Sequence, residues 1–135
     1  MQKTPGMNKY AIKQALQLMQ THINALNERD ASLLQKTLHF PHHRLSGTTW
    51  KTWETPERYF EDFLKRAGDN WKRSTFEDIR VVDSSENKVH LDAEIRRYDS
   101  NDILISQFRS LWVIVEIDGI SVSYTHLTLP TILLV

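Results

Sequence analysis

Residues 88–98 alternate between two kinds of side chain, and this alternation constrains the fold more than any other feature of the sequence. Every second position is apolar, and the members are Val89, Leu91, Ala93 and Ile95. Successive side chains of a strand point to opposite faces of a sheet, so the segment predicts a strand with one buried face and one polar face. Arg97 falls on the apolar face, which makes it a candidate for contact with a ligand rather than with solvent.

Segments on both sides of this strand share its period. We expect neighbouring strands over 75–83 and 103–117, because the polar turns 84–87 and 99–102 separate them from the middle strand. Short turns of this kind join adjacent antiparallel strands, so the second half of the chain predicts an antiparallel meander. Residues 39–45 and 48–54 are also extended in pattern, and the break at Ser46-Gly47 predicts a short hairpin.

The first half of the chain has helical spacing instead. Asn8 and Asp30 are expected to cap two helices, and Thr55 followed by Pro56 is a strong signal for the start of a third. The third helix is expected to end at Gly68. Its predicted buried stripe recurs at intervals of three and four residues and consists of Tyr59, Phe60, Phe63, Leu64 and Ala67.

Helices that precede strands with one covered face are typical of the α+β class. The chain has 135 residues and shows neither an internal repeat nor a low-complexity linker, so we expect one folded domain. With 17 basic and 17 acidic residues and no long run of either sign, binding to nucleic acid or to a membrane surface is disfavoured. There is no cysteine, which excludes disulfides and cysteine-based metal sites. No apolar run approaches the roughly 20 residues of a membrane span, so a cytoplasmic location is expected.

The end of the sequence differs in character from the rest. Residues 122–135 resemble the conceptual translation of a sequencing adapter, and no charged residue occurs from Gly119 onward. We therefore interpret residues 121–135 as a non-native tail that is either poorly packed or an improvised edge strand. The alternative is a natural terminal strand, because Val122 and Tyr124 have good strand propensity. On the first interpretation His126 has no functional role.

Three motifs carry a family resemblance. Phe40, Pro41, His42 and Arg44 form the first, Trp71, Ser74, Phe76 and Glu77 the second, and Phe108, Ser110, Leu111 and Trp112 the third. Together with the order of elements, they resemble the SnoaL-like branch of the nuclear transport factor 2-like superfamily. The resemblance covers residues 9–120, after a flexible tail over residues 1–8. It implies a curved antiparallel sheet that forms a cone with three helices around an internal pocket, and a domain truncated of its last strand.

Several residues are candidates for a site. His42 and Arg44 lie two apart on a predicted strand and share a face, where a titratable imidazole could move a proton while a guanidinium holds an oxyanion. Either residue could instead be structural. Aromatic candidates for the wall of a pocket, each of which could equally be ordinary core, are Trp50, Trp53, Tyr59, Phe63, Phe108 and Trp112. No metal site is expected, because the alternation of a strand separates His42 from His43.

Three functions remain open at this stage. The first is an enzyme without a cofactor, an isomerase, dehydratase or cyclase that uses His42 as the acid/base group and Arg44 or Arg97 to hold an anion. The second is a non-catalytic domain that binds a small apolar or cyclic ligand. The third is a dimerisation module, with a homodimer formed through the sheet.

Overall fold

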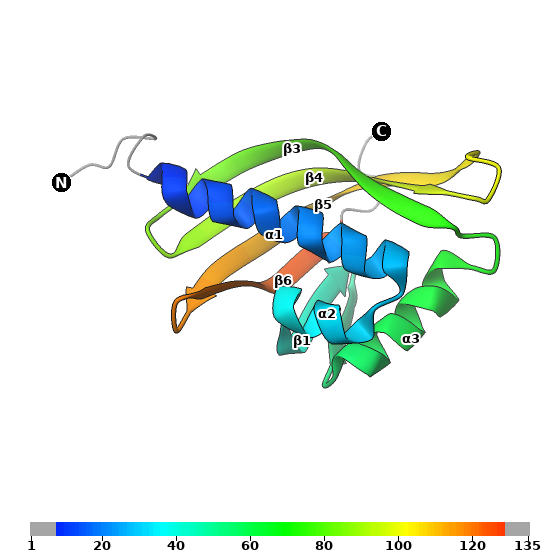
Figure 1. Ribbon diagram of the computed structural model, residues 1–135, viewed down its shortest axis with the longest axis horizontal. Coiled ribbons are helices and arrows are strands. Elements are labelled where there is room, and N and C mark those ends of the chain that lie inside the picture. The colour runs from blue at the N-terminus through cyan, green and yellow to red at the C-terminus, as the bar shows by residue number, and fades with distance from the viewer. Residues whose placement is uncertain (1–7, 129–135) are drawn as a thin grey trace.

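The computed structural model describes residues 8–128, which form an α+β fold of three helices and six strands (Figure 1). In chain order the elements are α1 (Lys9–Glu28), α2 (Ala31–Thr37), β1 (Leu38–Ser46), β2 (Thr49–Trp53), α3 (Pro56–Ala67), β3 (Arg73–Ser84), β4 (Lys88–Tyr98), β5 (Leu104–Ile117) and β6 (Ile120–Thr128). The predicted fold class is confirmed. Residues 1–7 of the expected N-terminal tail lie outside the described part of the chain.

Side-chain caps fix the starts of two helices. The Asp30 carboxylate accepts a hydrogen bond from the backbone N–H of Leu33 at 3.0 Å, and the Thr55 hydroxyl accepts one from that of Arg58 at 3.2 Å. Both caps confirm the prediction. Asn8 does not cap α1: its side-chain amide instead donates to the carbonyl of Ser84 at 3.2 Å and holds the start of the helix against β3.

The strands form one sheet in the order β2-β1-β6-β5-β4-β3. The predicted β1–β2 hairpin and the β3–β4–β5 meander are both present, and their pairs are antiparallel. The sheet is mostly antiparallel, as expected, and the pair β1–β6 is the parallel exception among the described strands. β6 follows β5 in an antiparallel hairpin, and its other edge pairs with β1 of the β1–β2 hairpin, where the two strands run in the same direction.

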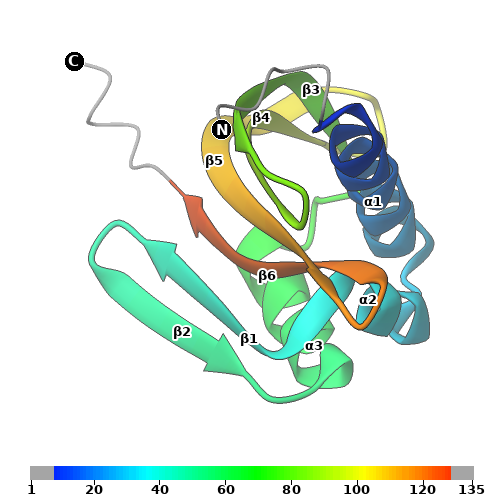
Figure 2. The ribbon, with the colours of Figure 1, turned by 90° about the vertical axis from the view of Figure 1, so that its left-hand side faces the viewer.

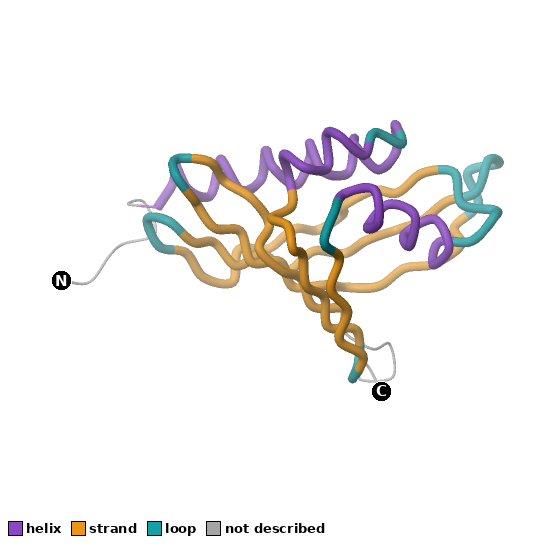
Figure 3. The backbone as a smooth tube through the Cα atoms, turned by 90° about the horizontal axis from the view of Figure 1, so that it is seen from below, coloured by secondary structure: helices purple, strands orange, loops and turns teal. Residues whose placement is uncertain are grey.

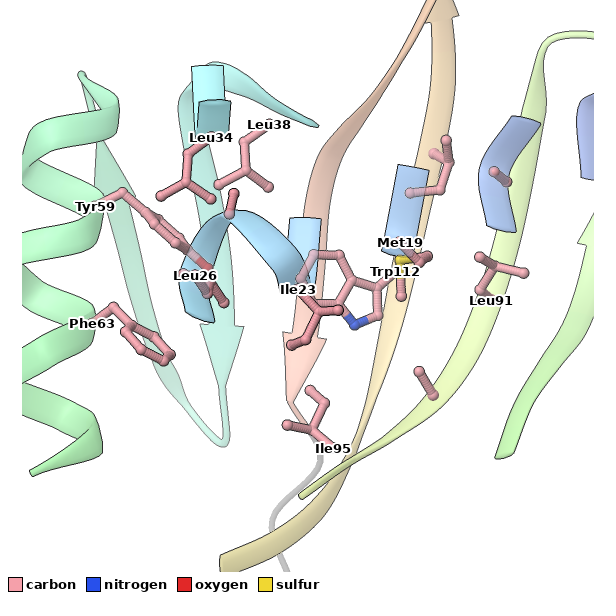
Figure 4. Close-up of a cluster of buried hydrophobic side chains, with 14 of the residues drawn as sticks. Met19, Ile23, Leu26, Leu34, Leu38, Tyr59, Phe63, Leu91, Ile95 and Trp112 are labelled. Carbon is pink, nitrogen blue, oxygen red and sulfur yellow. The ribbon is translucent and has the colours of Figure 1, made fainter. Parts of the chain in front are cut away.

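The apolar core lies between the sheet and the helices. α1 crosses the sheet over β3 and β4, while α3 lies beside the β1–β2 hairpin (Figures 1 and 2). The alternation in β4 is confirmed, since all four of its predicted core residues, Val89, Leu91, Ala93 and Ile95, are buried. Viewed from below, the sheet curves and the helices lie along one side of it (Figure 3). Side chains from all three helices converge with Trp112 of β5 on that side (Figure 4).

Two buried serines, from the second and third sequence motifs, accept hydrogen bonds from the indole N–H groups of two buried tryptophans. The indole N–H of Trp71 donates to the Ser74 hydroxyl at 2.8 Å, and that of Trp112 donates to the Ser110 hydroxyl at 2.7 Å. A buried indole N–H without a partner is costly, so these serines allow large aromatic rings into the core. Asn27 of α1 bonds to both backbone groups of Ser74, at 2.8 and 2.9 Å, which locks α1 onto β3.

The adapter-like segment forms β6 in the interior of the sheet. Residues 120–128 pair with β5 on one side and β1 on the other, and Ser123 and His126 are buried. The expectation of poor packing or an edge strand is therefore wrong. The segment alternates and is rich in β-branched residues, so it suits a strand position whatever its origin. Its residues after Thr128 lie outside the described part of the chain. Among residues 8–128, no helix is long and apolar enough to cross a membrane.

Candidate functional site

A cavity of about 220 Å³ lies where the concave face of the sheet meets α1 and α3. It draws lining residues from both helices and from strands β1, β3, β4, β5 and β6. Larger hollows beside α2 and α3 are more open grooves, and of the residues predicted for the site Trp53 alone lines one of them. The cavity on the concave face is therefore the candidate site.

Five aromatic side chains form much of the cavity wall: Tyr59, Phe63, Phe76, Phe108 and Trp112. Four of them are among the aromatic residues predicted from the sequence. Phe76 meets Trp112 edge to face, with ring centroids 5.5 Å apart. Figure 4 shows Tyr59 and Phe63 projecting from α3 toward the side chains on the sheet. The wall offers flat apolar surfaces of the kind that bind rings.

Three arginines, Arg44, Arg66 and Arg97, also line this cavity. Arg97 lies between two rings, 4.9 Å from the centroid of Phe108 and 5.3 Å from that of Phe63. Arg44 and Arg66 each lie 5.6 Å from the Trp53 ring. Arg44 and Arg97 were predicted for this site, and the structure brings them together although they come from strands far apart in the sequence.

Little negative charge balances these arginines. Asp62 accepts a hydrogen bond from Arg66 at 2.9 Å and another from Lys51 at 3.0 Å, so its carboxylate is shared. Burial alone would raise the pKa of Asp62, but these bonds hold it below its usual value. Among residues 8–128, no carboxylate forms an ion pair with Arg44 or Arg97. Burial, with Arg66 and Arg44 nearby, lowers the pKa of Arg97 to about 10, so its guanidinium stays charged at neutral pH.

Two histidines of the wall are uncharged at neutral pH. Burial lowers the pKa of His22 to about 3. Burial also holds the pKa of His126 well below 6.5, and the positive charges of Arg44 and Arg66 act in the same direction. His126 stacks on Trp112 with ring centroids 4.3 Å apart. The site thus combines neutral imidazoles with charged guanidiniums.

His42 does not line the cavity. It is fully buried behind His126, and the Nε2 atom of His42 lies 2.9 Å from Nδ1 of His126, a hydrogen-bond distance. Burial lowers the pKa of His42 to about 3, with a smaller contribution from His22. The side chains of His42 and Arg44 share a face of β1, as predicted, because both contact the Trp53 ring. Arg44 lines the cavity, whereas the His126 ring lies between His42 and the cavity. The alternation of the sequence predicts which face of the strand a side chain lies on, but not whether that side chain lines the cavity or is buried in the core.

Trp50 lies away from the site. Its side chain is 57% exposed and stacks on His43, with ring centroids 5.5 Å apart. Residues three apart in a strand point to opposite faces, so β2 buries Trp53 and turns Trp50 outward. Within the described residues, no group of three metal-ligating side chains could hold a metal ion.

Sequence reasoning missed Phe76 among the aromatic residues of the site, and among its titratable residues it missed His22, Arg66 and His126. Arg66 follows Phe63 by three positions and Tyr59 by seven, so the helical period places it on the buried stripe of α3. In its place Leu64, predicted to be buried, is 40% exposed. His22 lies three positions after the buried Met19 and four before the buried Leu26. His126 was set aside because the tail resembles an adapter.

Solved structures share this fold. A protein with a cystatin-like fold from Nostoc punctiforme has a TM-score of 0.71 at 11% identity, with 100% of each chain covered. Aln2 from a Streptomyces species has a TM-score of 0.69 at 12% identity, with 99% of this chain and 97% of Aln2 covered. A nuclear transport factor 2-like protein from Cytophaga hutchinsonii has a TM-score of 0.65 at 16% identity, covering 84% of this chain and 93% of its own. At these identities the likeness concerns the fold, and it confirms the expected cone. No family model and no curated protein matches the sequence.

Proposed function

We propose that this chain, which has the nuclear transport factor 2-like fold, is a pocket domain that binds a small cyclic molecule without transforming it. The observation that carries the proposal is the cavity itself, with aromatic walls contributed by α3 and by the concave face of the sheet. Pockets that bind small molecules are concave and mostly apolar, with few polar groups to fix orientation. Here the flat faces of Phe108 and Tyr59 supply the apolar surface.

The volume limits the ligand. The cavity measures about 220 Å³. Pockets for drug-sized ligands measure roughly 300 to 1,000 Å³, so the ligand here is smaller, with one or two rings.

Acid/base catalysis is the second candidate function, favoured by the two imidazoles on the cavity wall. An isomerase, dehydratase or cyclase needs a group whose pKa lies near the working pH. His22 has a pKa lowered to about 3 and is a weak base as a result. Among the described residues, no carboxylate lines the cavity to take that role. Binding therefore ranks above catalysis.

A thermal-shift screen with one- and two-ring compounds tests the proposal. A ligand that binds the folded state alone raises the melting temperature as its concentration increases. The variant Ile95→Phe adds volume at the cavity wall and should abolish the shift, whereas Val81→Phe, at a position 43% exposed on β3, should retain it. Circular dichroism establishes that both variants fold. A shift that persists in folded Ile95→Phe would place the ligand elsewhere, and a screen without any shift would refute the proposal.

A further inference from the structure

We propose that the ligand of this pocket is a small aromatic anion, such as an aryl carboxylate, whose charged group is held by Arg44, Arg66 and Arg97. The inference rests on the proposed binding function and names the chemical class of the ligand. It follows from three arginines that line the cavity and carry unsatisfied donors, from the shortage of negative charge around them and from the rings that surround them.

Each arginine has a buried nitrogen without an acceptor. The unpaired atoms are Nε of Arg44, Nη2 of Arg66 and Nε of Arg97. A guanidinium is charged at any physiological pH, and its N–H groups form a rigid planar fork that matches the two oxygens of a carboxylate. Buried charged donors without partners are unfavourable, and proteins retain such groups where function requires them. An anion in the cavity would supply the negative charge that these three guanidiniums lack.

The groups already present in the cavity do not replace that anion. Phe63 and Phe108 flank Arg97, but a ring contacts the face of a guanidinium and leaves the N–H groups at its edge without acceptors. Asp62 accepts one bond from Arg66 and one from Lys51. Its carboxylate therefore compensates Arg66 only in part.

The three guanidiniums act on one region of the cavity. Arg44 and Arg97 each have a pKa lowered first by burial and then by the charge of Arg66, so the three positive groups repel one another. All three also oppose the rise in the pKa of Tyr59 that burial causes, and Tyr59 lines the same cavity. A single anion between them would relieve this repulsion, and Tyr59 and Phe108 would hold its ring.

The arginines of the proposed anion site do not belong to the adapter-like segment, so the proposal does not depend on the origin of that segment. Arg44, Arg66 and Arg97 all lie before Val122, where the adapter-like segment begins. The wall residues Tyr59 and Phe108 also lie before it. A different sequence in β6 would change the neighbour His126 and leave the arginines in place.

Paired probes test the charge. We expect 2-naphthoate to bind about 10- to 100-fold more tightly than its uncharged isostere 2-naphthamide, measured by isothermal titration calorimetry at fixed ionic strength. Equal binding of the two compounds would overturn the anionic class while leaving a small-molecule pocket. Binding of neither compound would refute both the anion and the pocket, provided that one-ring pairs such as benzoate and benzamide also fail.

Variants assign the binding to the arginines. Arg97→Gln and Arg44→Gln should each weaken 2-naphthoate about 10- to 100-fold and leave 2-naphthamide nearly unchanged. Arg80→Gln is the matched control, because Arg80 is exposed on β3 and does not line the cavity. If a glutamine variant does not fold, Arg97→Lys keeps the charge, loses the planar fork and should weaken 2-naphthoate by less. Unchanged affinity for the carboxylate in a folded arginine variant would overturn the proposal.

Discussion

Three buried histidines should make the stability of the fold fall as the solution becomes mildly acidic. His22 and His42 have pKa values lowered to about 3, and the pKa of His126 is lowered in the same direction. Around His22 lie the Thr37 hydroxyl, 3.1 Å from Nδ1, and the rings of Tyr59, Phe76 and Trp112. None of these groups carries a negative charge, and burial keeps the pKa of His22 low.

The sign and magnitude follow from proton linkage. Unfolding exposes each histidine and returns its pKa to about 6.5, so below pH 6.5 the unfolded chain binds protons that the folded chain does not. The free energy of unfolding is unaffected above pH 6.5 and decreases as the pH falls from 6.5 toward 3. At pH 5.5 each histidine costs about 1.4 kcal/mol. His22 and His42 together cost about 3 kcal/mol, and His126 adds to the loss.

Urea denaturation at pH 7.5 and at pH 5.5 measures this loss, and the variant His22→Gln assigns part of it. Glutamine does not titrate, so the loss between the two pH values should shrink by about 1.4 kcal/mol in the variant. Thr37→Val is the control, because it removes the hydroxyl beside His22 without removing a titrating group. It should lower stability equally at both pH values. An unchanged pH dependence in His22→Gln would refute the assignment of His22 as a buried neutral residue.

Three further predictions concern the fold. Leu91→Ala, at a fully buried position of β4, should lower the free energy of unfolding by about 2 to 5 kcal/mol in urea denaturation, whereas Val82→Ala, at a position 59% exposed, should change it by less than about 0.5 kcal/mol. Thr55→Ala should cost about 1 kcal/mol in the same assay through loss of the α3 cap, and Thr55→Ser should restore it; equal stability of both variants would argue against the cap. A chain ending at Gly119 lacks β6, which is the partner of both β1 and β5, and should show no cooperative thermal transition by circular dichroism. A sharp transition there would mean that the sheet closes without β6.

The regular elements could be predicted from the sequence because each has a local physical cause. A period of two in β4 and a capping hydroxyl before a proline at the start of α3 act over a few residues, and nothing elsewhere in the chain opposes them. The expected cap at Asn8 was wrong for a tertiary reason, since its side chain reaches β3 instead.

The composition of the site depends on how deeply each side chain is buried and on contacts between residues far apart in the sequence, and local sequence patterns predict neither. His42 and Arg44 share a face, yet one side chain is covered by His126 and the other reaches the cavity. The covering residue is 84 positions from His42 in the sequence. Arg66 could have been found, because it continues the helical stripe of Tyr59 and Phe63. A charged residue on an apolar stripe, as at Arg97, proved to be the most informative signal for the cavity.

The adapter-like origin of residues 122–135 remains a prediction. Reading the nucleotides that encode the chain after Ser121 decides it. A strand of non-native origin would still need neighbours, and β1 and β5 offer backbone groups on both sides of β6. In that case the backbone pairing of β6 would be retained, and His126 would be the residue of the site that changes.

The central place of β6 has a consequence for synthesis on the ribosome. Translation produces the β1–β2 hairpin early and the β3–β4–β5 meander later, but the strand that joins them emerges last among the described strands. The bond from the Thr125 hydroxyl to the carbonyl of His43 spans 82 positions, so it cannot form until almost the whole described chain has left the exit tunnel. Until then the nascent chain exposes the unpaired backbone edges of β1 and β5, which are sites for misassociation with other nascent chains. Chaperones that bind extended segments would therefore have their longest opportunity at these two edges.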